Sequence, residues 1–279
     1  MTNPRDDGPA VTLIARRDRL LRPGHLVPML VRHLESRRAR VGIVDPDVEA
    51  VPLHDLRTVD ADLYVLASPT DAALSLAGAL EECGGAVFPT YAVAAACRDK
   101  IVQTAVLARA GLPVPASWLT VHPDSMAEEL ARGPLLIKDP RGSRGRGLHL
   151  VRRREELLRL SHGTPWLAMR YHRPDGPDLK LYRIGTEVHA VARVFPALSL
   201  ADKMGRPFDV TPELRRLALR CGAAFGTTVC GVDVIRSGGR LWVVDMSSFP
   251  GFKGVPDAAE RIADVVLALA VARQPERAS

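Results

Sequence analysis

The sequence predicts a mixed α/β fold, in part α+β, with a parallel α/β unit, a small α+β unit and a β-rich C-terminal part. Three observations predict it. Strand-like and helix-like segments alternate over residues 10–90, a glycine-rich turn joins two apolar strands near residue 140, and three strands in succession begin at residue 166. With 279 residues, 47% hydrophobic and 25% charged, the chain is long enough for two or three subdomains.

The first unit is predicted over residues 10–90, after a polar tail (residues 1–9) that we expect to be disordered. Helical spacing predicts a helix between its first two strands, and Thr70 caps a second helix that ends at a glycine pair. No glycine-rich dinucleotide fingerprint follows the first strand, so a dinucleotide fold is not predicted. The predicted strands are 11–15, 40–45, 61–68 and 86–89.

Residues 91–165 are predicted to form a second, smaller α+β unit. Its first helix continues from residue 90 to a stop at Gly111, and a proline-rich exit follows. Further along, the predicted elements are a strand at 117–121, a helix at 124–133, two strands flanking the glycine-rich turn, and a helix at 155–162.

The remaining residues, 166–279, are predicted to be a C-terminal subdomain built on an antiparallel sheet. The stretch 196–210 has no clear pattern and is a candidate mobile loop. The predicted elements are strands at 166–172, 178–185 and 187–195, a helix at 211–226, a hairpin at 229–248 and a final helix at 256–273.

The glycine-rich turn, "IKDPRGSRGRG" at 137–147, is the first candidate site. It does not match the phosphate loop that joins a strand to a helix, but glycines let backbone N–H groups converge on one anion, and Ser143 adds a hydroxyl donor. Lys138 ends the strand before the turn. The alternatives are a plain hairpin tip or an arginine–glycine segment for nucleic acid, which would require repeats and disorder.

Two carboxylates inside apolar strands form the second candidate site, since a buried charge needs a partner or a metal. A three-residue loop in the hairpin would place Asp233 opposite Asp245, whereas a two-residue loop would put them on opposite faces. Facing carboxylates repel unless a cation such as Mg²⁺ lies between them. Ser247 faces the same way as Asp245. The alternative is one salt-bridged and one capping aspartate.

Composition argues against several classes of protein. The net charge of +6 suits nucleotides as well as nucleic acid, and with 5% aromatic residues and dispersed arginines we expect no nucleic-acid partner. No apolar run approaches the roughly 18 residues of a membrane span, so we expect no membrane contact and a cytoplasmic location. The four cysteines are scattered, and the eight histidines show no metal-ligand spacing.

Four segments, in order, resemble the ATP-grasp superfamily over roughly residues 90–270. They are "RDK" (98–100), the glycine-rich turn, "DLKLYRIG" (178–185) and "GVDVI…VVDMSSFPGFKGV" (231–255). The resemblance implies an ATP-grasp fold with an N-terminal pre-ATP-grasp domain, a lid subdomain and an antiparallel C-terminal subdomain. It also implies ATP with Mg²⁺ or Mn²⁺ as cofactors, and a homodimer is common in similar proteins.

The resemblance also assigns roles to residues of this sequence. ATP would be bound by two lysines, the lid turn, the hinge backbone that meets adenine, and a carboxylate near the ribose. These residues are Lys100, Lys138, Gly142, Ser143, Arg144, Gly145, Gly147, Met169, Arg170, Tyr171 and Asp178. Lys180 and Arg193 would act on phosphate or substrate. The metal ligands would be Asp233, Asp245 and Ser247.

Two residues depart from the family's pattern. The family usually has asparagine at the place of Ser247 and an acidic residue at the place of Arg170. Motifs similar to those of RimK-like glutamate ligases imply an ADP-forming carboxylate–amine ligase that acts on a small molecule or peptide through an acyl phosphate. The alternatives are a kinase like the inositol phosphate kinases of the same fold, or a nucleotide-binding protein with weakened catalysis.

Overall fold

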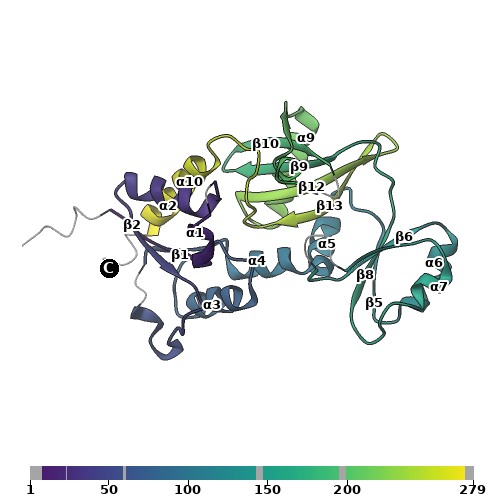
Figure 1. The fold of residues 1–279 in the computed structure, drawn as a ribbon, viewed down its shortest axis with the longest axis horizontal. Helices are drawn as coiled ribbons and strands as arrows, with labels where there is room; N and C mark the ends of the chain where they lie inside the picture. The colour runs from purple at the N-terminus through teal and green to yellow at the C-terminus, as the bar shows by residue number, and fades with distance from the viewer. Residues whose placement is uncertain (1–7, 23, 59–60, 143–146, 195–198, 274–279) are drawn as a thin grey trace, which may run out of the picture.

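The computed structural model of the protein describes residues 8–22, 24–58, 61–142, 147–194 and 199–273 (Figure 1). Three sheets follow one another along the long axis of the molecule, and most of the predicted N-terminal tail lies outside the described residues. The mixed α/β class predicted from the sequence is confirmed. Among the described residues, no helix combines the length and apolar character of a membrane span.

The first sheet is parallel, with strand order β2-β1-β3-β4. Its strands are β1 (Ala10–Ile14), β2 (Arg40–Val44), β3 (Leu63–Leu66) and β4 (Val87–Phe88), and its helical segments are α1 (Arg17–Leu20), α2 (Leu26–Ser36), η1 (Leu53–Thr58) and α3 (Asp71–Glu82). Thr70 caps α3 as predicted, because its hydroxyl accepts the N–H of Ala73 at 3.3 Å. The carboxyl ends of these strands meet at one edge, where α/β sheets bind ligands.

The C-terminal helix α10 (Ala258–Arg273) packs against α2 of this first sheet (Figure 1). Its buried residues Ile262, Ala263 and Val266 share one apolar cluster with residues of β1, α2 and the central sheet. The last helix therefore joins the two ends of the chain, although the predicted boundaries place it with the C-terminal subdomain.

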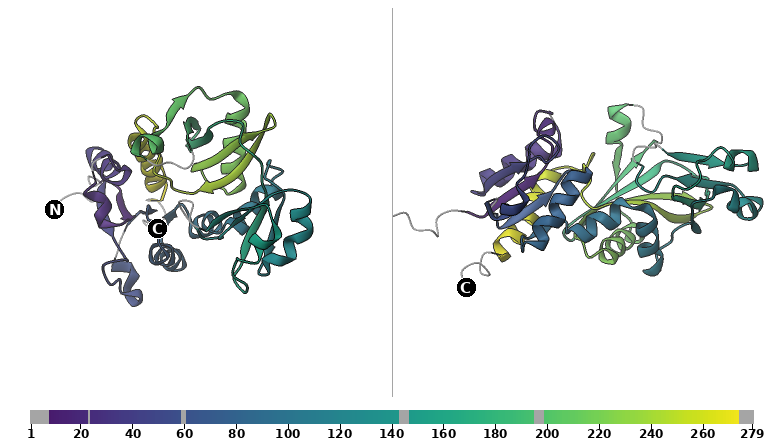
Figure 2. Two further views of the ribbon diagram at one scale, coloured as in Figure 1. Left: turned by 45° about the vertical axis from the view of Figure 1, so that its right-hand side comes forward. Right: turned by 90° about the horizontal axis from the view of Figure 1, so that it is seen from below.

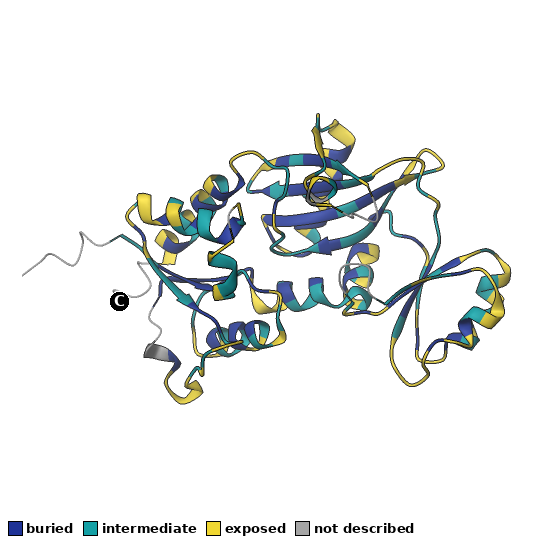
Figure 3. Cartoon of the chain, viewed as in Figure 1, coloured by how far each residue is buried: buried dark blue, intermediate teal, exposed yellow. Residues whose placement is uncertain are grey.

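The central sheet is antiparallel, with strand order β11-β10-β9-β12-β13. Its strands are β9 (Asp178–Ile184), β10 (Glu187–Arg193), β11 (Arg206–Phe208), β12 (Val229–Ser237) and β13 (Arg240–Ser247). One face packs against helix α9 (Pro212–Ala224), and this core appears as dark blue strands in Figure 3. The stretch 196–210, expected as a mobile loop, contains helix α8 (Leu200–Met204) and edge strand β11; residues 195–198 are outside the described part.

The third sheet, hereafter the lid sheet, is antiparallel, has strand order β5-β8-β6-β7 and lies at the far end of the molecule from the N-terminal sheet (Figure 2). Its elements are β5 (Ser117–Thr120), η2 (Pro123–Met126), α6 (Ala127–Ala131), β6 (Leu135–Lys138), β7 (Leu148–Val151), α7 (Arg154–Leu157) and β8 (Trp166–Arg170). β8 pairs with β5 and β6, not with the central sheet to which the prediction assigned it. The two helices predicted here are shorter than expected.

The long helix predicted to end at Gly111 is in fact two helices, α4 (Tyr91–Arg98) and α5 (Lys100–Arg109). Asp99 between them is extended (φ −95°, ψ 107°), and its carboxylate accepts the N–H groups of Ile101 and Val102. Asp99 is thus the N-cap of α5, a role for which aspartate is strongly favoured over helix-interior positions. The break matters because it frees the backbone of Lys100 for another contact, described below.

Candidate active site

The hairpin of β12 and β13 brings the two strand carboxylates face to face by a route that the sequence did not predict. Its loop has two residues, Gly238 and Gly239, both with positive φ, and this loop length alone would place the carboxylates on opposite faces. The register shifts by one residue between Asp233 and the next pair, so that Asp233 lies opposite Asp245. A β-bulge therefore produces the facing pair that we expected from a longer loop.

Lys180, Asp233 and Asp245 form a row across three neighbouring strands. The Nζ atom of Lys180 lies 2.8 Å from Oδ2 of Asp233, and the lysine is 5% exposed. Burial by itself lowers the pKa of Lys180, but the attraction of Asp233 outweighs it and leaves that pKa raised. Lys180 is therefore a buried cation at the metal site predicted from the sequence.

The next row explains why a glycine is present beside the carboxylates. Gly231 lies between Tyr182 on β9 and Ser247 on β13. A Cβ atom at Gly231 would lie 2.9 Å from Cγ of Pro250 and 3.0 Å from Cε of Lys180. The missing side chain lets the lysine stem and the loop after β13 pass over the sheet.

Strand β13 is an edge strand whose outward backbone groups are used to attach the neighbouring units. The buried side chain of Gln103, on α5, donates to the Met246 carbonyl at 2.8 Å and accepts the Met246 N–H at 2.9 Å. The N–H of Val243 donates to the carbonyl of Pro113 at 2.7 Å. Nζ of Lys138, from the lid sheet, donates to the carbonyl of Val244 at 3.2 Å. These contacts cover an edge that would otherwise be exposed.

Lys100 contacts the glycine-rich turn through both its backbone and its side chain. Its backbone N–H donates to the Pro140 carbonyl at 3.0 Å, and its Nζ lies 2.5 Å from the Gly142 carbonyl. At the base of the turn, the N–H of Asp139 donates to the carbonyl of Gly147, which has φ +68°. Of the predicted lid residues, Ser143, Arg144 and Gly145 lie outside the described part of the chain.

The remaining charges converge on the same face of the central sheet. Burial lowers the pKa of Lys138, with Lys100 adding to this and Asp245 opposing it. Burial, together with the nearby charge of Asp233, raises the pKa of Asp178 to about 6. Three carboxylates and three lysines thus gather where the lid and central sheets meet, and the carboxyl of Asp178 is partly buried among them.

Arg193, predicted to reach phosphate or substrate, is turned toward the sheet. Its guanidinium donates to the hydroxyl of Tyr182 and to the carbonyl of Lys253, and it lies 5.7 Å from the centre of the Tyr182 ring. The Lys180 ammonium lies 6.0 Å from the same ring. The arginine therefore ties the loop that carries Lys253 to the strand that carries Lys180, and its buried Nε has no hydrogen-bond partner among the described residues.

The predicted hinge, Met169 to Tyr171, lies at the end of β8. The N–H groups of Arg170 and Tyr171 already donate to the carbonyls of Ala116 and Pro134, both at distances typical of a sheet. The guanidinium of Arg170 pairs with Glu129 at 3.0 Å and lies over Trp118. The side chain of Arg170 therefore belongs to the packing of the lid, and its place in ATP binding stays a prediction.

A cavity of about 340 Å³ opens beside the metal site predicted from the sequence. It lies between the carboxyl end of β3, the helix break at Lys100, the glycine-rich turn and the loop after β13. Its polar lining includes Ser68, Thr70, Arg98, Arg141, Asp245 and Ser247. Nε of Arg98 is buried without a hydrogen-bond partner, while its terminal nitrogens bind Pro69 and Asp71.

Sequence reasoning missed three contributors to this region. Gln103 and Tyr182 occupy ordinary helix and strand positions in the sequence, and Arg98 belongs to the segment "RDK" without an assigned role. The one signal that the sequence offers for Gln103 is a polar residue on a helix face whose other buried member is apolar. The three buried cysteines, Cys97, Cys221 and Cys230, are free thiols, as is the exposed Cys83.

Comparison with known families matches residues 97–269 to the RimK-like ATP-grasp domain. A probable alpha-L-glutamate ligase of Alkalilimnicola ehrlichii is 30% identical over 58% of this chain and 58% of its own length. One of Thioalkalivibrio sulfidiphilus is 28% identical over 58% of this chain and 59% of its own. The chain thus spans less than two thirds of the length of these curated relatives.

Solved structures share the fold along nearly the whole chain. A RimK domain ATP-grasp protein from Sphaerobacter thermophilus superposes with a TM-score of 0.74 and 22% identity, covering 92% of this chain and 99% of that one. The ATP-grasp ligase PsnB, complexed with a minimal precursor, Mg and ADP, gives a TM-score of 0.72 and 20% identity, covering 97% and 99%. The predicted ATP-grasp fold is confirmed.

Proposed function

This chain belongs to the RimK-like ATP-grasp domain family, and on that premise we propose that it is an ADP-forming ligase that joins a carboxylate to an amine. ATP and Mg²⁺ (or Mn²⁺) are the cofactors of the proposal, and the acceptor is a small molecule or a peptide. The match to a RimK-like domain favours this function over the kinase that the sequence left open.

The observation that carries the proposal is the row of Lys180, Asp233 and Asp245. Two carboxylates that face each other in a sheet repel, and here one of them holds a buried ammonium at 2.8 Å. Burial, together with the charge of Asp233, raises the pKa of Asp178 to about 6, so a cation at this place would stabilise the ionised carboxyl. A divalent cation with oxygen ligands fits this donor set, with Asp233 and Asp245 as ligands and the hydroxyl of Ser247 beside them.

The chain's own residues would bind and orient ATP. Lys100 contacts the glycine-rich turn and Lys138 ends the strand that leads into it, so that their charges would bind phosphate oxygens, and Lys180 would stay beside the phosphoryl group in transfer. Asp233 and Asp245 would hold Mg²⁺, and the ion would neutralise phosphate charge when bound. Catalysis of this kind depends on positioning and on charge and requires no covalent bond to the protein.

The acceptor would occupy the cavity at the carboxyl end of β3. Its volume suits a small acid or the end of a peptide, and Arg98 and Arg141 give it a positive lining. The carboxylate would attack the γ-phosphorus as ADP leaves, and the amine would then attack the carbonyl carbon as inorganic phosphate leaves and a proton is lost. During these steps the hinge backbone at Met169 would meet adenine, and Gly142 would belong to the lid over the phosphates.

The test is release of ADP by the purified chain with ATP and Mg²⁺, in a matrix of candidate carboxylates and amines. The proposal predicts ADP release that needs both substrates, with one amide formed per ADP by mass spectrometry. Asp245→Asn should abolish release, and Asp264→Asn, a matched change of an exposed carboxylate on α10, should not.

Two results would contradict the proposal in different ways. ADP release with a hydroxyl acceptor alone would indicate a kinase. Binding of ATP that depends on Mg²⁺, without ADP from any pair of substrates, would favour the weakened nucleotide-binding protein, for which the serine at position 247 is the specific reason. The homodimer stays a prediction, and sedimentation velocity would test it.

A further inference from the structure

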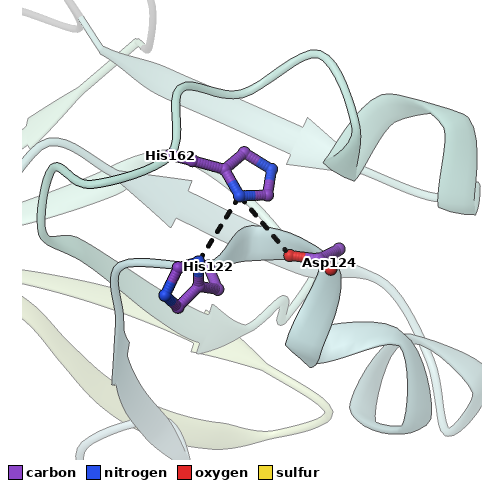
Figure 4. A group of neighbouring side chains, drawn as sticks. All are labelled: His122, Asp124 and His162. Atoms are coloured by element: carbon purple, nitrogen blue, oxygen red, sulfur yellow. Dashed lines mark hydrogen bonds and ion pairs between the residues drawn. The ribbon is translucent and has the colours of Figure 1, made fainter.

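A second cluster of metal-ligating side chains lies on the lid sheet. His122, Asp124 and His162 point toward one another, as Figure 4 shows. Nδ1 of His162 lies 3.5 Å from Nδ1 of His122 and 3.8 Å from Oδ1 of Asp124. Within the described part of the chain, this is the single group of three such side chains whose ligand atoms all lie within 4.8 Å of one another.

The backbone holds the two contributing segments together. His122 and Asp124 lie in the turn between β5 and α6, and His162 lies in the loop between α7 and β8, 40 residues along the chain from His122. The N–H of Gly163 donates to the carbonyl of Val121 at 3.0 Å. The hydroxyl of Thr120 accepts the N–H of His122 at 2.9 Å. The cluster is therefore built on fixed backbone and does not depend on side-chain placement alone.

One atom of the cluster lacks the partner that its environment requires. Oδ1 of Asp124 is shielded from solvent and accepts no hydrogen bond from the described residues, although the side chain as a whole is 46% exposed. This same oxygen is the one that faces Nδ1 of His162. A carboxylate oxygen removed from water without a donor is unfavourable, and a cation between the three groups would satisfy it.

The geometry is close to that of a zinc site. Zn²⁺ binds imidazole nitrogen and carboxylate oxygen at about 2.0–2.2 Å in a tetrahedron, which places neighbouring ligand atoms roughly 3.3 Å apart. The two separations from Nδ1 of His162, 3.5 and 3.8 Å, exceed this by about 0.2 and 0.5 Å, and all three ligand atoms lie within 4.8 Å of one another. Two imidazoles and one carboxylate favour a borderline transition metal over Mg²⁺, which prefers oxygen ligands.

We propose that His122, Asp124 and His162 bind one Zn²⁺-class divalent ion on the outside of the lid, with a fourth position open to water. The ion would link the turn after β5 to the loop before β8. Because the hinge lies at the opposite end of β8, the ion would stabilise the lid sheet and would take no part in the ligase reaction. The proposal stands whether or not the proposed ligase function is correct.

The experiment is a calorimetric titration of the intact chain with Zn²⁺ under an excess of Mg²⁺, added to compete for the carboxylates of the central sheet. The exposed Cys83 is replaced by serine throughout, so that its thiol cannot bind zinc. We expect one equivalent to bind, and we expect His162→Asn and Asp124→Asn each to weaken binding by at least about tenfold. Zn²⁺ should also raise the Tm of the parent chain more than that of either variant.

His54→Asn, which changes an exposed histidine in η1 of the N-terminal unit, is the matched control and should bind zinc like the parent chain. Far-UV circular dichroism checks that the variants fold, and His122→Asn replaces any variant that does not. Absence of saturable zinc binding would overturn the proposal. Binding that is equally strong in the parent and in both site variants would also overturn it, because the zinc would then lie elsewhere.

Discussion

Gln103 is the residue whose replacement tests the architecture of the site most directly. Its amide is buried on α5, donates to the carbonyls of Cys97 (2.7 Å) and Met246 (2.8 Å), and accepts the N–H of Met246 (2.9 Å). Gln103→Leu keeps nearly the same volume and removes these three hydrogen bonds. The change therefore isolates the polar contribution from packing.

The magnitude follows from the groups left behind. Two carbonyls lose a donor in a buried region, while the N–H of Met246 keeps a second acceptor, Oδ1 of Asp245, at 3.0 Å. Each buried group left without its partner costs about 1–3 kcal/mol, so for the two carbonyls we expect the free energy of unfolding to fall by roughly 2–6 kcal/mol. Asp245 should also be drawn toward the backbone, which would weaken binding of Mg²⁺.

The assay is urea unfolding of the parent chain and the variant, followed by circular dichroism. Val102→Gln, on the exposed side of the same helix, is the control and should change the free energy of unfolding by no more than about 0.5 kcal/mol. A loss below about 1 kcal/mol for Gln103→Leu would refute the reasoning. It would mean that the edge of β13 does not depend on this amide.

Three further predictions concern charged residues. Asp233→Asn leaves Lys180 buried without its counter-ion, and unfolding by urea should show a loss of roughly 2–4 kcal/mol, less than for a fully buried pair because Asp233 is 35% exposed. The pKa of Asp178 is raised from its usual 3.8 to about 6 in the folded chain. Between pH 3.8 and pH 6 the folded chain therefore binds more protons than the unfolded chain, so the free energy of unfolding falls as pH rises through this window. Asp178→Asn should therefore be more stable than the parent at pH 7, with the advantage vanishing below about pH 4; equal stability at pH 7 would contradict this. Arg170→Ala removes the contacts to Glu129, so hydrogen exchange of backbone amides in the lid should accelerate while ATP affinity stays the same. Loss of ATP affinity without faster exchange would indicate that the Arg170 side chain binds the nucleotide.

The glycine-rich turn and the two carboxylates could be predicted because their signals are local. Glycines in a strand–turn–strand pattern restrict what the backbone can do, and a charge inside an apolar strand is unfavourable without a partner, wherever the strand lies. The placement of Lys138 at a strand end follows from the same kind of local pattern. These signals depend on a few consecutive residues and therefore remain visible in the sequence alone.

The register of the hairpin was decided at the level of tertiary structure. The two-residue loop predicts opposite faces for Asp233 and Asp245, and only the bulge reverses this. The bulged stretch of β13 is where Lys138 of the lid sheet and Pro113 bind the backbone of the strand. No local pattern could indicate a bulge whose partners come from more than a hundred residues away.

By itself, the sequence determined the kinds of elements, their order and the residue types of the candidate site, because hydrophobic period, turn residues and caps act over short distances. Tertiary structure alone decided which segments meet. The last helix packs on α2, Arg170 turns to Glu129, and His122 meets His162 across 40 residues. Such contacts depend on how whole sheets pack, and packing is a property of surfaces that the chain possesses only after it has folded.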